Sequence, residues 1–215
     1  MKNILLVNLS PRPKGTSLVL ASKCREYLES KGHRVELLHL YPNLNRPDSL
    51  HQAVKAADTL ILSGPSYINT YPADTMAFLE MLSSHKELLH GQDLYGMIQG
   101  GMPYVHTHES GLMLLEIFGR KCNMNYKGGF VMGMGAMLDG RPLEKLINAK
   151  KVIRQLGIFF EHIEKGETSP ARVYQAAQLK IPGFVYRIMA AAVNQSMDKE
   201  LKKRGIDITG PSPYL

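Results

Sequence analysis

The feature that most constrains the fold is the alternation of short apolar runs with helical patterns along the first 165 residues. The apolar runs are typical of buried strands, and the segments between them repeat apolar side chains at helical spacing. We expect strands at residues 4–9, 34–40, 59–63, 93–99 and 129–133, and helices at residues 16–30, 50–57, 73–83, 107–120 and 142–165. The sequence therefore predicts an α/β fold, a doubly wound five-stranded parallel sheet with the common strand order 2-1-3-4-5.

The loop after the first expected strand has the composition of a phosphate site. Hydroxyl, basic and small residues follow one another there before a helix begins, namely Ser10, Arg12, Lys14, Gly15, Thr16 and Ser17. Free backbone N–H groups and the positive end of a helix dipole attract an anion at such a position. Ordinary helix capping also uses Ser, Thr and Pro, so the density of these residues carries the prediction. A phosphate in the first βα turn indicates a nucleotide-like cofactor.

Three better-known phosphate motifs are absent from this loop. The Walker spacing of Gly, four residues and Gly-Lys-Ser/Thr does not occur, and neither does Gly-x-Gly-x-x-Gly. The low-molecular-weight tyrosine phosphatases need a cysteine at the start of the loop, and Cys24 and Cys122 lie elsewhere. The loop is therefore a phosphate loop of none of these three kinds.

Two more loops are expected at the same edge of the sheet. The loop after the third strand contains Pro65, Ser66, Tyr67, Ile68 and Asn69, and the loop after the fourth begins at Gly100 and Gly101 and continues to Tyr104. Glycines allow the backbone to approach a flat ring, and a tyrosine can cover one face of it. Either loop alone could be a plain turn. All three together favour a heterocycle attached to the phosphate.

These residues resemble the flavodoxin-like NAD(P)H-dependent FMN reductases, a family of flavin oxidoreductases that includes quinone reductases and azoreductases. Ser10-Pro11-Arg12 with Gly15-Thr16-Ser17 is similar to the family's phosphate loop. The segment 65–73 with Phe78-Leu79-Glu80 is similar to its flavin loop and following helix, and Gly100-Gly101 matches its third loop. The resemblance covers roughly residues 1–165.

The resemblance implies a cofactor, a reductant and a set of binding residues. FMN would be bound, with NADPH or NADH as reductant and a quinone, nitro, azo or free flavin compound as acceptor. The phosphate would be held by Ser10, Arg12, Thr16 and Ser17, with Lys14 and Gly15 completing the loop. The ring system would be lined by Pro65, Ser66, Tyr67, Ile68 and Asn69, and by Gly100 and Gly101. No catalytic side chain is expected, because flavin N5 carries the chemistry in this family.

The sequence also departs from the family pattern at several positions. Leu9 and Asn69 stand where the family usually has glycine, and Ile68 replaces a common aromatic residue. Met76 and Met81 occupy positions usually held by Lys and Arg. We expect the phosphate site to be intact and the environment of the ring to differ from that of the family.

The segment His106-x-His108-Glu109 contains two metal-ligating residue types. No third ligand cluster accompanies it, so we expect no metal site. Because it follows the third loop, we expect Tyr104, His106 and His108 to line the substrate pocket, where a histidine could donate a proton to a reduced acceptor.

Composition and charge exclude several other classes. The apolar fraction is 44%, the charged fraction 21% and the net charge +7. The basic excess suits an anionic cofactor, and no nucleic-acid motif accompanies it. No apolar run is long enough to span a bilayer, and the N-terminus runs into a strand without a secretory signal. We therefore expect a cytoplasmic protein with no integral membrane segment and no nucleic-acid partner.

The chain continues beyond a minimal flavodoxin-like domain. We expect residues 1–165 to form the FMN-binding domain and residues 166–215 to form a helical extension, with helices at 173–179 and 184–204 and an extended segment at 209–215. The apolar side of the second helix suits packing on the domain or on a partner subunit better than on a membrane surface. By family resemblance we expect a homodimer or a higher homo-oligomer.

Two other functions remain open from the sequence. A flavodoxin-type electron carrier would use the same loops, although its usual acidic charge is missing here. A regulatory or structural protein with the same fold would leave the site empty or hold a nucleotide, and Leu9 and Asn69 are compatible with this alternative.

Overall fold

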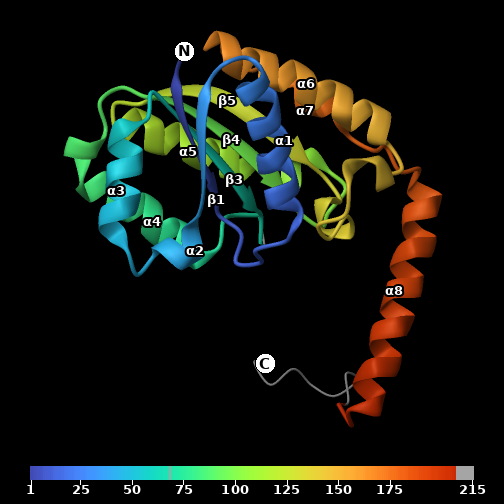
Figure 1. Cartoon of the computed structure of the whole chain (residues 1–215). Coiled ribbons are helices and arrows are strands. Elements are labelled where there is room, and N and C mark those ends of the chain that lie inside the picture. The colour runs from blue at the N-terminus through green and yellow to red at the C-terminus, as the bar shows by residue number, and fades with distance from the viewer. Residues whose placement is uncertain (68, 207–215) are drawn as a thin grey trace. The chain divides into compact units, whose positions relative to one another are not determined.

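A five-stranded parallel sheet forms the centre of the protein (Figure 1). The computed structural model describes residues 1–67 and 69–206. The strands are β1 (Asn3–Asn8), β2 (Arg34–His39), β3 (Thr59–Pro65), β4 (Asp93–Gln99) and β5 (Asn125–Met132). Their order is β2-β1-β3-β4-β5, and every neighbouring pair is parallel. The predicted doubly wound sheet is confirmed.

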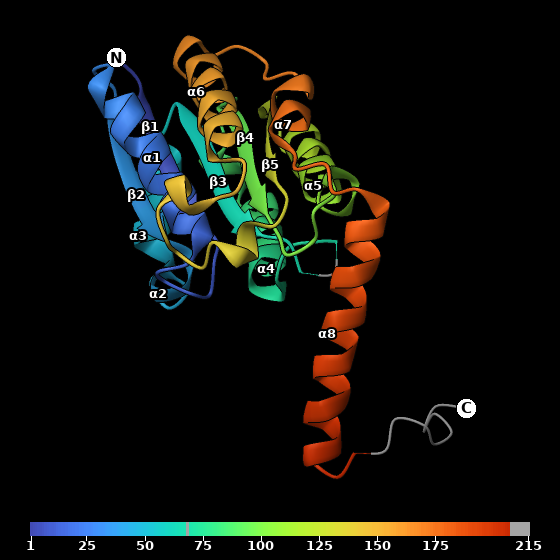
Figure 2. The same ribbon diagram turned by 90° about the vertical axis from the view of Figure 1, so that its right-hand side faces the viewer.

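Helices cover both faces of this sheet (Figures 1 and 2). One face is covered by α1 (Thr16–Ser30) and α6 (Ala149–Lys165), and the other by α3 (Pro47–Ala56), α4 (Ala73–Ser84) and α5 (Glu109–Lys121). Two shorter helices are α2 (Leu40–Asn43) and α7 (Arg172–Ala177), which packs against α6 and β5. Single 3-10 turns occur at Lys86–Leu88, Val105–Thr107, Gly135–Met137 and Leu143–Lys145.

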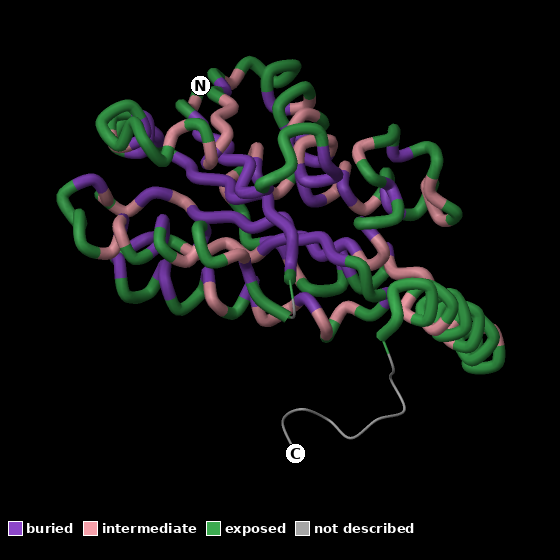
Figure 3. Tube along the Cα trace, turned by 90° about the horizontal axis from the view of Figure 1, so that it is seen from below, coloured by how far each residue is buried: buried purple, intermediate pink, exposed green. Residues whose placement is uncertain are grey.

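The core lies along the central strands, as the buried trace in Figure 3 shows. All residues of β3 are buried, and so are the residues of β1 after Asn3. Strands covered on both faces are apolar without alternation, which explains why the runs at Ile4 and Leu60 were readable from sequence. The carboxyl ends of β1, β3 and β4 then place three loops at one edge of the sheet.

Two predicted elements differ from the structure by more than three residues at one end. The single helix expected over residues 142–165 is wrong, because Leu143–Lys145 is a 3-10 turn and α6 begins only at Ala149. Leu146 between them is extended (ψ 145°) and packs against the core, which interrupts the helix. Strand β5 begins at Asn125, earlier than expected, since this edge strand starts with half-exposed residues that form no apolar run.

The chain divides into two compact units, Met1–Leu179 and Lys180–Leu215. Helix α7 belongs to the first unit, beyond the boundary expected at residue 165, and its Val173 and Tyr174 are buried. The second unit contains α8 (Gly183–Lys203), and the extended segment expected at 209–215 lies outside the described residues. Among the helices of the described residues, none has the length and apolar character needed to cross a membrane.

Candidate functional site

The loop from Leu9 to Gly15 leaves β1 and reaches the start of α1. Leu9 donates its N–H to the Ser63 carbonyl at 2.8 Å, and its side chain is fully buried. Ser10 donates its N–H to Asn8 Oδ1 at 3.2 Å, and Ser10 Oγ accepts the Arg12 N–H at 3.2 Å. Leu9 therefore points into the core, where Gly64 leaves it room, while residues 11–14 are exposed.

The N-terminus of α1 has unpaired backbone donors. Its cap residue is Gly15, and no side chain caps it. Among the described residues, the N–H groups of Thr16 and Ser17 have no hydrogen-bond partner. Unpaired N–H groups and the helix dipole make this end of α1 attractive to an anion.

The hydroxyls of Thr16 and Ser17 form hydrogen bonds to other parts of the domain. Thr16 Oγ1 donates to the Gly135 carbonyl at 2.7 Å, and Ser17 Oγ accepts from Gln99 Nε2 at 3.3 Å. Both residues are buried. Of the hydroxyls expected to hold phosphate, Thr16 donates its proton within the protein, whereas those of Ser10 and Ser17 accept hydrogen bonds and donate none among the described residues.

A fourth loop, which the sequence analysis did not predict, contacts the phosphate loop between Leu9 and Gly15. Residues 133–141, named the β5 loop from here on, follow β5 and contact the phosphate loop at three points. The Arg12 guanidinium pairs with Asp139 at 2.8 Å, Thr16 bonds to Gly135, and the Gly140 Cα lies against the Lys14 carbonyl. The available signal was a strand followed by Gly133-Met134-Gly135 and Asp139-Gly140, which is typical of a turn at a strand end.

The second loop turns tightly after β3. Ser66 donates its N–H to the Gln99 carbonyl at 2.7 Å, and Tyr67 and Thr70 form an isolated bridge. Asn69 has φ 64°, in the left-handed region, and Ser110 Oγ donates to its carbonyl. A glycine would adopt this conformation freely and asparagine is among the residues that tolerate it best, so Asn69 fits the turn. Ile68 lies outside the described residues.

The third loop is organised by His108. Its Nε2 lies 3.0 Å from the Met102 carbonyl, and its ring packs directly on the Gly100 Cα. Tyr104 and His106 stack with centroids 5.7 Å apart and planes 16° apart. Tyr104 and Tyr67 are partly exposed, whereas His108 is buried. Of the three residues expected in the substrate pocket, Tyr104 and His106 pair with each other while His108 supports the loop.

Buried polar atoms without partners lie between the loops. Ser66 Oγ and Gln99 Oε1 are buried and have no hydrogen-bond partner among the described residues. Gln99 connects β4 to α1 through Ser17, and its side chain lies against Gly135. An uncapped helix end beside unpartnered amide and hydroxyl oxygens fits a ligand with a phosphate and a polar heterocycle edge.

The departures at Met76 and Met81 concern packing and not the site. Both side chains are partly buried against the core, and Met81 Sδ lies 2.9 Å from His51 Nε2. No group of three or more metal-ligating side chains occurs within residues 1–67 and 69–206.

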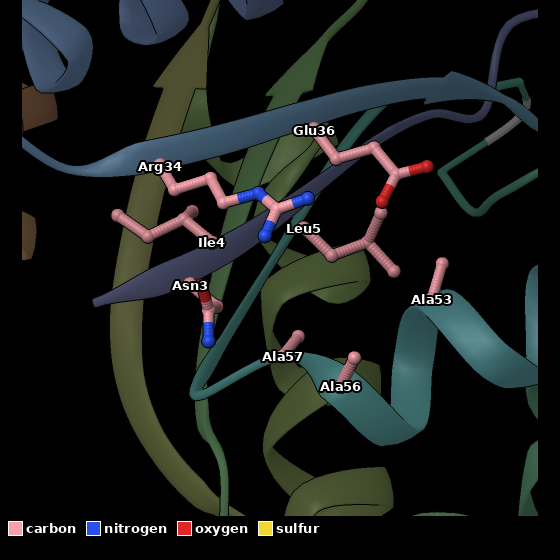
Figure 4. Close-up of a pocket in the computed structure, with 8 residues that line it drawn as sticks. All are labelled: Asn3, Ile4, Leu5, Arg34, Glu36, Ala53, Ala56 and Ala57. Atoms are coloured by element: carbon pink, nitrogen blue, oxygen red, sulfur yellow. The ribbon is translucent and has the colours of Figure 1, made fainter.

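A separate hollow lies near the opposite end of the sheet. It has a volume of about 120 Å³ between the starts of β1 and β2 and helix α3 (Figure 4). Arg34 and Glu36 extend over it, and Ala53, Ala56 and Ala57 line its wall. Asn3 and Arg34 begin their strands, so this hollow is distinct from the loops at the carboxyl ends.

Comparison with protein families agrees with this geometry. The family model described as NADPH-dependent FMN reductase matches residues 2–134, which is more than half of the chain. The match defines a flavin-dependent oxidoreductase built on a flavodoxin-like fold. The chain belongs to the NADPH-dependent FMN reductase family, which confirms the resemblance in the sequence.

Solved structures show the same fold. An apo NADH:FMN oxidoreductase superposes with a TM-score of 0.62 at 19% identity, covering 81% of this chain and 94% of that chain. A WrbA-like flavodoxin from Agrobacterium tumefaciens has a TM-score of 0.55 at 13% identity, covering 78% and 99%. The general stress protein 14 of Treponema denticola, solved in complex with FMN, has 0.53 at 13%, covering 77% and 99%. No curated protein matches the sequence.

Proposed function

We propose that this protein is an FMN-dependent NAD(P)H oxidoreductase that passes electrons from NADPH or NADH to a small acceptor. Quinones, nitro compounds, azo compounds and free flavin are the acceptor classes. The observation that carries the proposal is the uncapped start of α1 at the same sheet edge as the loops after β3 and β4. Family membership supports FMN as the ligand of these loops.

The phosphate is assigned to the first loop. The Thr16 and Ser17 N–H groups, the Ser10 hydroxyl and the Arg12 guanidinium supply donors and positive charge, and Lys14 and Gly15 complete the loop. The buried Thr16 and Ser17 hydroxyls fix the backbone that presents those N–H groups. Preorganised donors bind an anion with little further ordering cost.

The ring system is assigned to the other two loops. Pro65, Ser66, Tyr67, Ile68 and Asn69 line one side, and Gly100 and Gly101 lie on the other. The buried unpartnered oxygens of Ser66 and Gln99 support this assignment, because a heterocycle edge would satisfy them.

The chain's own residues bind and orient in this proposal. FMN, when bound, accepts electrons from the nicotinamide and passes them to the acceptor, so no catalytic side chain is assigned. Tyr104 and His106 offer a stacked, partly exposed surface for a flat acceptor, and His108 holds the loop beneath them. We further propose a cytoplasmic homo-oligomer with a C-terminal helical extension that packs on the domain or on a partner subunit.

The direct test is an anaerobic spectroscopic titration of the purified protein. FMN is added first and its fluorescence quenching gives the Kd, and then NADPH or NADH is added while the flavin absorbance is followed. We expect saturable FMN binding and loss of the flavin absorbance with at least one nicotinamide. Binding without reduction by either nicotinamide would favour the electron carrier, and no binding would refute the flavin assignment.

A matched pair of variants localises the phosphate. Arg12→Ala removes a cation at the first loop, whereas Arg154→Ala removes an exposed cation on α6. We expect the first variant to weaken FMN binding by about tenfold, the size of one charge-assisted hydrogen bond. The second should leave the FMN Kd unchanged.

A further inference from the structure

The contact between the phosphate loop and the β5 loop has one charged member on each side. Arg12 Nη1 lies 2.8 Å from Asp139 Oδ1, and the two residues are separated by 127 positions in the chain. Thr16 Oγ1 and the Gly135 carbonyl, both buried, hold the same two loops together. Asp139 is therefore the acidic neighbour of the cation assigned to phosphate.

The backbone fixes Asp139 at this place. Asp139 has φ 48° and Gly140 has φ 79°, so both adopt the left-handed conformation. A side chain at position 140 would come within 2.0 Å of the Lys14 carbonyl, so only glycine allows this approach. The carboxylate is thus held beside the phosphate loop by main-chain geometry as well as by its ion pair.

The ion pair itself is exchangeable. The side chains are 56% and 65% exposed, and pairs this exposed contribute little to stability. Arg12 can therefore leave Asp139 for a stronger anion without a large penalty. A phosphate arriving at α1 would meet a guanidinium that is already engaged and a carboxylate of its own sign.

We propose that Asp139 is a specificity-determining residue that weakens the binding of phosphorylated flavin by competing for Arg12 and repelling the phosphate. This inference rests on the proposed function. It implies that Asp139 acts on the charged phosphate and has no effect on a flavin without one. A phosphate at neutral pH carries most of two negative charges, so a nearby carboxylate repels it.

The test compares two flavins and three proteins. The Kd values of FMN and riboflavin are measured by fluorescence quenching at low salt for the wild type, Asp139→Asn and Glu161→Gln. Asparagine tolerates the left-handed conformation and keeps the shape of the side chain. Glu161→Gln removes the same charge from α6, close to its end at Lys165.

We expect Asp139→Asn to bind FMN about three- to tenfold more tightly, the size of one exposed charge interaction. Riboflavin affinity should stay within about twofold, and Glu161→Gln should match the wild type. The FMN advantage should shrink as salt is raised, because the interaction is screened. An Arg12→Ala substitution should cost more FMN affinity in the Asp139→Asn background than in the wild type.

Equal or weaker FMN binding by Asp139→Asn would overturn this role while leaving the proposed function intact. An equal gain for riboflavin would also overturn it, since riboflavin has no phosphate. Failure of the wild type and of Asp139→Asn to bind FMN would refute the flavin assignment itself.

Discussion

The imidazole of His108 lies against the Cα of Gly100, and a side chain at position 100 would overlap the ring. A Cβ built there comes within 2.2 Å of His108 Cε1 and 2.6 Å of Nδ1. The ring cannot swing away freely, because it is buried and bonded to the Met102 carbonyl. This pair sets the shape of the third loop.

Gly100→Ala should therefore destabilise the protein by about 2–3 kcal/mol, through overpacking and loss of the His108 hydrogen bond. Urea denaturation measures the free energy of unfolding. Gly101→Ala is the control, since its Cβ would meet Ala136 Cβ at an ordinary 3.8 Å. The losses caused by Gly100→Ala and His108→Ala should be non-additive by about 1 kcal/mol or more in the double variant. Additive losses would contradict the contact between the two residues.

Asn69 provides a test of backbone strain in the second loop. Its φ of 64° costs an ordinary side chain about 1 kcal/mol, whereas glycine adopts it freely. Asn69→Ala should lower the free energy of unfolding by about that amount, and Asn69→Gly should stay closer to the wild type. Asn45→Ala, at an exposed position without a positive φ, is the control. Equal effects of Asn69→Ala and Asn69→Gly would argue against the left-handed turn.

Tyr71 and Tyr95 are two buried tyrosines that differ in their hydrogen bonding. Tyr71 Oη has no partner among the described residues, and burial raises its pKa well above 10.0. Tyr95 Oη donates to the Glu167 carbonyl at 2.8 Å. Tyr71→Phe should leave stability unchanged or raise it by up to about 1 kcal/mol, while Tyr95→Phe should lower it by about 1 kcal/mol. Thermal and urea denaturation would show a reversed order if Tyr71 had a strong partner.

His33 predicts a pH dependence of stability. Its Nδ1 accepts the Lys2 N–H at 3.2 Å, and burial, the chain's amino terminus and Lys2 lower its pKa below 6.5. Because the unfolded chain binds the proton more readily, stability should fall as the pH drops through 6.5. The Tm of the wild type relative to His33→Gln should decrease between pH 8 and about pH 5.5. A pH-independent difference in Tm would contradict this assignment.

The sequence predicted the sheet well because its central strands are covered on both faces. Runs such as the one ending at Val7 have no alternation and stand between clear turn residues. The predicted range of the edge strand β5 is too short, because Tyr126 and its neighbours are only partly buried. Their sequence therefore shows only a weak apolar pattern. Local helix propensity also led to a predicted helix that includes Leu143. In the structure, contacts of Leu146 with the core interrupt that helix.

The candidate site was predictable where its chemistry is local. Ser10, Arg12 and Gly15 stand together in the sequence, and capping rules indicate what a helix start can bind. The β5 loop was missed because its role depends on contacts across the whole domain. Nothing near Asp139 in the sequence indicates that Arg12 lies beside it. The requirement for glycine at position 140 comes from the Lys14 carbonyl, which is distant in the sequence.

The same long separation between Arg12 and Asp139 has a consequence for synthesis. The chain emerges from the ribosome with its first loop early and its β5 loop last among the strand-end loops. A nascent chain that ends before Gly135 lacks the β5 loop, so Thr16 and Lys14 have no opposing loop. The contacts of the phosphate loop are thus completed only after strand β5 and the loop that follows it have been synthesised.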